Sequence, residues 1–133
     1  MPDALAGSCL CGAVRFRANG PFRPVIACHC HQCRKTSGHY VAATQCDSDA
    51  LAFERDEGLR WYRSSPEAER GFCAACGSSL FWRPVDGRRL SIMAGCLDGE
   101  SGLRLESQLF IEQAGDYYEV PPVPAVPQAT LKR

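Results

Sequence analysis

Cysteine spacing constrains this chain more than any other feature, because seven of its nine cysteines fall into three short clusters, at residues 9–11, 28–33 and 73–76. Thiols only a few residues apart converge on one metal ion more readily than they form an unstrained disulfide. Thiolates at such spacings are typical zinc ligands. The sequence therefore predicts a zinc protein whose clustered cysteines are reduced.

Two of the clusters have the form of zinc knuckles. Cys9 and Cys11 precede Gly12, and Cys73 and Cys76 precede Gly77. A glycine after the second cysteine lets the backbone fold back toward the metal without a Cβ clash. Four thiolates complete a tetrahedral shell, so we expect one closed, structural zinc site that joins the two clusters. The alternative is four separate buried thiols.

The middle cluster is of a different kind. Cys28, Cys30 and Cys33 offer three thiolates within six residues, and no knuckle glycine follows them. Three protein ligands leave a fourth position open to water or substrate, which distinguishes catalytic from structural zinc. We therefore predict a second, catalytic zinc here, which makes two zinc ions per chain.

Other residues could change this interpretation by closing the second site. His29, His31 or His39 would convert it into a structural site with three cysteines and one histidine. Cys96 follows a predicted strand, and a turn there could bring its thiol to the metal. An unclustered cysteine is, however, most often a small buried apolar residue, which is our preferred interpretation of both Cys46 and Cys96.

The charge of the predicted open site indicates the class of substrate. Zinc held by three thiolates carries a formal charge of minus one, yet it still lowers the pKa of an incoming thiol, so a sulfur substrate is favoured. Arg34 and Lys35 directly follow the last ligand. We expect them to offset the negative charge and to orient substrate carboxylates, although a solvated basic turn is the alternative.

The pattern of the remaining chain predicts a mainly β fold with short antiparallel strands and little helix. Segments with alternating, β-branched or aromatic residues predict the strands: 13–17, 25–28, 40–45, 51–54, 59–63, 79–83, 90–94 and 109–112. A single helical turn is predicted at 31–37. We expect one domain over residues 1–133, with a core at 7–120 and a proline-rich tail at 121–133 that is extended and outside the sheets.

Charge and the amino terminus restrict partners and location. Lys plus Arg and Asp plus Glu are balanced at 15 each, which removes the positive field that drives nucleic-acid binding. Residues 1–7 contain neither a basic start nor an apolar run, so neither a signal peptide nor a membrane span is expected. Together with reduced cysteines, this predicts a cytoplasmic protein.

Three segments in order, 7–16, 28–38 and 72–81, resemble the glutathione-dependent formaldehyde-activating enzyme family, which also contains centromere protein V. The resemblance extends through 93–98 and covers most of residues 7–112. It departs from the family where Gln108 stands in place of a usual histidine, where Cys96 replaces a commoner serine or threonine, and at 114–118, where a usual lysine and tryptophan are missing.

The resemblance implies a β-tent fold with zinc-ribbon-like knuckles. It also implies a structural zinc on the two knuckles and a catalytic zinc on Cys28, Cys30 and Cys33. The activity it implies is the joining of formaldehyde to glutathione as S-hydroxymethylglutathione. We therefore expect a zinc-dependent carbon–sulfur lyase acting on a small thiol such as glutathione and an aldehyde. The alternatives are a non-catalytic zinc module that binds a protein partner and, because it shares the β-tent, methionine sulfoxide reduction.

Overall fold

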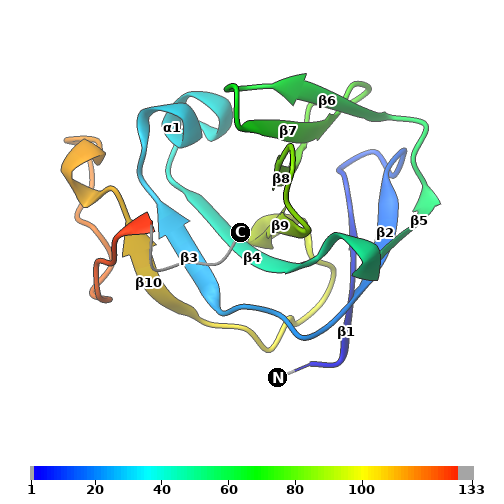
Figure 1. The fold of residues 1–133 in the computed structure, drawn as a ribbon, viewed down its shortest axis with the longest axis horizontal. Helices are drawn as coiled ribbons and strands as arrows, with labels where there is room; N and C mark the ends of the chain where they lie inside the picture. Colours follow the sequence, from blue (N-terminus) through cyan, green and yellow to red (C-terminus); the bar gives the residue numbers. More distant parts are fainter. Residues whose placement is uncertain (1, 129–133) are drawn as a thin grey trace.

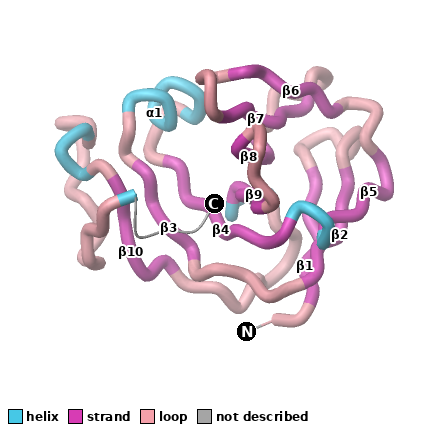
Figure 2. Tube along the Cα trace, in the orientation of Figure 1, coloured by secondary structure: helices cyan, strands magenta, loops and turns pink. Residues whose placement is uncertain are grey.

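The computed structural model describes residues 2–128, so Met1 and the end of the predicted tail, 129–133, lie outside the described residues. Strands dominate the described chain (Figure 2). They are β1 (Ala4–Ser8), β2 (Arg15–Asn19), β3 (Val25–Cys28), β4 (Val41–Asp47), β5 (Leu51–Arg55), β6 (Leu59–Arg63), β7 (Ala68–Cys73), β8 (Ser79–Pro84), β9 (Arg89–Met93) and β10 (Leu105–Leu109). The α-helix is α1 (His31–Ser37), and short 3-10 turns lie at Ser48–Ala50, Ala94–Cys96 and Ile111–Gln113.

The strands form two sheets. One has the order β1-β2-β5, and the other has the order β10-β3-β4-β9-β8-β7-β6. In Figure 1 the larger sheet runs from β10 and β3 on the left to β6 and β7 at the top, and the smaller sheet lies on the right. The predicted mainly β class is confirmed. The pairing differs in one respect, because β10 runs parallel to β3 while the other pairs of named strands are antiparallel.

The main core lies between the two sheets. Phe16 of β2 meets Phe81 of β8 edge to face, with ring centroids 5.1 Å apart, and Leu80 and Ile92 are fully buried beside them. A smaller cluster packs Cys33 of α1 against apolar side chains of β4 and β9. The second cluster places one of the predicted metal ligands inside a packed environment rather than on a mobile loop.

Several segments differ from the sequence-based expectation. β1 and β7 were not predicted, and β10 was placed too late, since Phe110 adopts the left-handed conformation (φ 56°) and ends the strand. β1 lacks β-branched and aromatic residues, and charged residues interrupt β7. The tail is not wholly outside the sheets either, because Ala125 forms a parallel bridge with Gln108. Within the described chain, α1 has only seven residues and no helix is long and apolar enough to cross a membrane.

The contact between β1 and β2 depends on Gly7. A Cβ atom at this position would lie 2.3 Å from Cζ of Phe16 and 2.8 Å from the carbonyl oxygen of Cys96. Because Phe16 is buried and cannot move aside, we expect Gly7→Ala to lower the free energy of unfolding by about 1–3 kcal/mol. Gly95→Ala is the matched control, since nothing lies within 4 Å of its added Cβ. Denaturant melts of both variants test this, and equal midpoints would contradict it.

Candidate functional site

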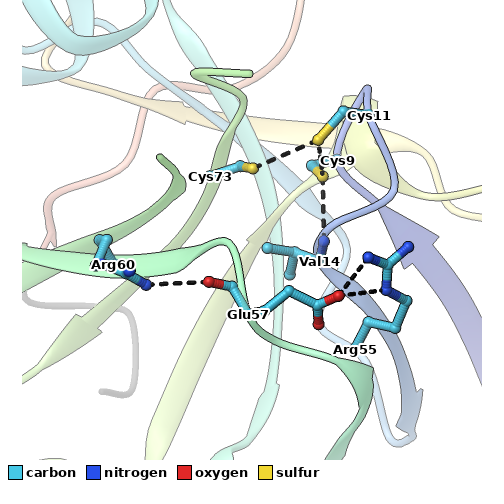
Figure 3. Close-up of polar contacts among 7 residues, drawn as sticks. All are labelled: Cys9, Cys11, Val14, Arg55, Glu57, Arg60 and Cys73. Atoms are coloured by element: carbon cyan, nitrogen blue, oxygen red, sulfur yellow. Dashed lines mark hydrogen bonds and ion pairs between the residues drawn. The ribbon is translucent and has the colours of Figure 1, made fainter. Parts of the chain in front are cut away.

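The two knuckle clusters meet in one group of four sulfurs. Sγ of Cys11 lies 3.7 Å from that of Cys9 and 3.8 Å from that of Cys73, and with Cys76 the four sulfurs lie within 4.8 Å of one another. Figure 3 shows the Cys9, Cys11 and Cys73 side chains pointing toward one another. Tetrahedral zinc with Zn–S bonds of about 2.3 Å sets sulfurs about 3.8 Å apart. The two short distances match this value, so the group suits zinc.

Local backbone geometry explains why these sulfurs converge. Gly12 and Gly77 adopt φ values of 84° and 81°, which side chains with a Cβ rarely adopt. The N–H of Gly77 donates to the carbonyl of Cys73 at 2.7 Å, which closes the turn after β7. The N–H of Val14 donates to Sγ of Cys9 at 3.2 Å on the opposite loop. Each knuckle glycine thus has the role that its position in the sequence predicts.

Ser78 connects the two knuckles. Its hydroxyl accepts from the N–H of Leu10 at 3.0 Å and lies 3.2 Å from Sγ of Cys76. Hydrogen bonds from the Ser78 side chain and backbone lower the pKa of the Cys76 thiol to about 5. Beside this group, Arg55 forms an exposed ion pair with Glu57 (Figure 3), which contributes little to stability in water.

The middle cluster forms a second group. Cys28 ends β3, Cys30 caps the amino end of α1, and Cys33 lies in its first turn. Their three sulfurs lie within 4.8 Å of one another, and Sγ of Cys30 accepts from the N–H of Cys33 at 3.4 Å. Hydrogen bonds from Cys28 and Cys33 lower the pKa of the Cys30 thiol, helped by the charge of Arg70. The hydrogen bond to Cys30 and burial raise the pKa values of Cys28 and Cys33, so the negative charge of the cluster rests on Cys30, and a bound cation would favour the thiolate form of all three.

No histidine of residues 2–128 joins this group. His29 is fully buried, and Nε2 lies 2.9 Å from Oε1 of Gln108 while Nδ1 meets the hydroxyl of Tyr118. Gln108 donates its amide to two tail carbonyls, so Oε1 accepts the Nε2–H of His29. Both ring nitrogens of His29 are therefore engaged away from the sulfurs. His39 bonds the hydroxyl of Tyr117 at 2.7 Å.

The thiol of Cys96 also stays outside the group. It donates to the carbonyl of Met93 at 3.0 Å, and burial raises its pKa to about 12. Cys46 is a fully buried core thiol whose pKa burial raises to about 11. Among the described side chains, the middle cluster therefore offers three possible metal ligands, and no further cysteine or histidine joins them.

The three sulfurs line a cavity of about 690 Å³. Its walls are largely apolar and come from β3, β4, β7, β8 and β9, with Trp82 and Met93 among them. Two arginines, Arg23 and Arg70, also line it. A cavity of this size, lined by apolar side chains together with polar and charged ones, is typical of a small-molecule site.

The predicted basic helpers lie elsewhere. Arg34 and Lys35 line a separate, smaller cavity of about 290 Å³ with His31, Gly38 and Tyr117. Arg34 donates to the carbonyl of Gln113 at 3.1 Å. Neither side chain lines the cavity that contains the three sulfurs. The sequence analysis missed Arg70, which is 7% exposed and whose Nη2 lies 3.8 Å from Sγ of Cys33.

A known protein family matches most of this chain. The family model for glutathione-dependent formaldehyde-activating enzyme matches residues 4–113. The chain belongs to this family. The family recognition is thereby confirmed, as is the prediction that the protein is an enzyme of the carbon–sulfur lyase type. The match includes both sulfur groups and Arg70.

Individual relatives support the family assignment. An uncharacterised lyase of Schizosaccharomyces pombe is 30% identical over 120 residues, which cover 90% of this chain and 86% of the relative. A putative glutathione-dependent formaldehyde-activating enzyme of Halomonas elongata is 39% identical over 85 residues, which cover 58% of this chain and 54% of the relative. The crystal structure of a Rhodobacter sphaeroides protein has the same fold, with a TM-score of 0.62 at 23% identity over 74% of this chain and 92% of that one.

Proposed function

We propose that this family member is a zinc-dependent carbon–sulfur lyase that joins a small thiol, such as glutathione, to an aldehyde. The observation that carries the proposal is the group of Cys28, Cys30 and Cys33, which opens onto a cavity instead of being closed by a fourth side chain of the described chain. In this proposal Cys9, Cys11, Cys73 and Cys76 hold a second zinc that is structural. Each chain then carries two zinc ions in the cytoplasm.

The two proposed zinc sites differ in function because one has three cysteine ligands and the other has four. Zinc bound by three thiolates lowers the pKa of an incoming thiol. Cys28, Cys30 and Cys33 would hold that zinc at the cavity wall, and the apolar walls would exclude water from the reacting sulfur. The substrate thiolate attacks the carbonyl carbon of the aldehyde. A carbon–sulfur bond forms, the carbonyl π electrons move to oxygen, and that oxygen takes a proton from solvent.

Zinc X-ray absorption of the zinc-loaded protein tests the proposal. We expect glutathione to raise the mean number of sulfur neighbours per zinc by about one half, because only one of two zincs gains a ligand. S-methylglutathione is the matched control, since it has the same peptide without a free thiol, and it should change nothing. An unchanged sulfur count with glutathione, cysteine and other small thiols would contradict the lyase and favour the non-catalytic zinc module.

A further inference from the structure

Arg70 is a buried cation with an unsatisfied donor. It lies on β7, its side chain lines the larger cavity, and it is only 7% exposed. Its Nε is fully buried and has no hydrogen-bond partner within residues 2–128. Burying a charged group without a partner is costly. A guanidinium at a cavity wall without a carboxylate on it therefore indicates a ligand that brings an acceptor to it.

The acidic residue next to Arg70 in the sequence does not form an ion pair with it. Glu69, the adjacent residue of β7, pairs instead with Arg83 at 2.7 Å. No carboxylate of the described chain forms an ion pair with Arg70. Its contact within the cavity is with Cys33, whose Sγ lies 3.8 Å from Nη2. The positive charge of Arg70 therefore acts on the sulfurs of the middle cluster and on any ligand that binds beside them.

The position of the guanidinium defines what it can reach. The planar group carries paired N–H donors that form a fork suited to oxygen anions. Nη2 donates toward the sulfur of Cys33, which places the guanidinium at the cavity wall beside that sulfur. A substrate sulfur held at the three cysteines would place the oxygen of the attacked carbonyl two bonds away from itself, on the side of the cavity where this guanidinium lies.

On the basis of the proposed function, we propose that the guanidinium of Arg70 donates a hydrogen bond to the oxygen that becomes negatively charged when the thiol adds to the aldehyde, so that the site selects sulfur compounds bearing an anionic oxygen close to the sulfur. In the addition, the sulfur–carbon bond forms and the carbonyl π pair moves to oxygen. The proton lost by the thiol to solvent is balanced by one that solvent returns to this oxygen. Arg70 stays protonated throughout, since guanidinium does not ionise in proteins.

A binding experiment separates this role from a structural one. The probes are mercaptoacetate and ethanethiol, which share a thiol but differ in a carboxylate beside it. We expect the zinc-loaded protein to bind mercaptoacetate at least about 10-fold more tightly than ethanethiol. Arg70→Met should reduce this preference to about 3-fold or less while the ethanethiol affinity and zinc content stay unchanged. Calorimetric titration measures both affinities.

Arg23→Met is the matched control. Arg23 lines the same cavity, but its Nη2 already donates to the carbonyl of Ala43 at 3.1 Å. Its replacement should therefore leave the preference for mercaptoacetate intact. Arg70→Lys keeps the charge without the fork and supplies the same measurement if the methionine variant does not fold. An unchanged preference in the folded Arg70 variant would overturn the role of Arg70.

Kinetics give a second readout. We expect Arg70→Met to lower kcat by about 10²–10³-fold and Arg70→Lys by about 10-fold, with KM for the thiol changing by less than about 3-fold in the lysine variant. Wild-type protein that binds thiols without preferring mercaptoacetate would overturn the inference and leave the lyase intact. Wild-type protein that binds no thiol would overturn the proposed function itself. The two failures are thereby distinguishable.

Discussion

Replacing Cys73 with serine is expected to release one of two zincs and to lower the melting temperature by at least about 15 °C. Cys73 is fully buried at the end of β7, and its sulfur lies 3.8 Å from that of Cys11 on the loop between β1 and β2. The proposed zinc would therefore tie the smaller sheet to the larger one. Structural zinc contributes folding free energy directly, because the unfolded chain does not hold a formed site. Serine cannot supply the missing thiolate.

The measurement combines zinc content per chain with a thermal melt. Cys46→Ala is the matched control, because Cys46 is equally buried in the same core but belongs to neither sulfur group. It should keep both zincs and lower the free energy of unfolding by only about 1 kcal/mol. A Cys73→Ser protein with the zinc content and melting temperature of the parent would show that the four-sulfur group is not a structural metal site.

The sulfur groups were predictable because their geometry is largely local. Spacings of one and two residues, followed by Gly12 or Gly77, fix each knuckle before any tertiary contact forms. The helical turn at 31–37 was also predicted, and α1 has these bounds. Pairing the two knuckles across the chain needed only the count of four ligands that zinc prefers.

Arg70 could not be found in this way, because its burial is a property of the sheet. Because β7 contains charged residues, its sequence does not indicate a strand. Only the pairing of β7 with β6 and β8 places the Arg70 side chain in the cavity. Lys35, by contrast, is adjacent to a ligand in sequence yet lines a different cavity. Proximity along the chain is a poor guide when a helix turns successive side chains to different faces.

The C-terminal part of the chain also makes contacts that local sequence patterns do not predict. The sequence 105–109 reads as polar, and the structure pairs it as an edge strand whose Gln108 joins the tail to His29. Tyr118 completes this network at Nδ1 of His29. Gln108 and Tyr118, two of the residues that depart from the family pattern, therefore hold His29, which lies between Cys28 and Cys30 in the sequence. No local pattern indicates such a contact over 79 residues.

Replacing Cys33 with serine should separate the two metal sites functionally. We expect the variant to lose one zinc and to form the thiol–aldehyde adduct at least about 100-fold more slowly, because two thiolates hold zinc poorly in an open site. Cys33 is 6% exposed and packs against Val41 and Met93, but it does not join the two sheets. Its melting temperature should therefore fall by less than half the change expected for Cys73→Ser.

Adduct formation is followed with glutathione and formaldehyde, after subtraction of the uncatalysed rate, alongside zinc content and a melt. Cys96→Ser is the matched control, since Cys96 packs beside the same small cluster while its thiol bonds the carbonyl of Met93. It should keep both zincs and react within about 3-fold of the parent rate. If Cys96→Ser instead loses zinc and activity as Cys33→Ser does, then Cys96 is a ligand in the working enzyme. The site would then be closed by the chain, and a substrate sulfur would have to displace that thiol before it could react.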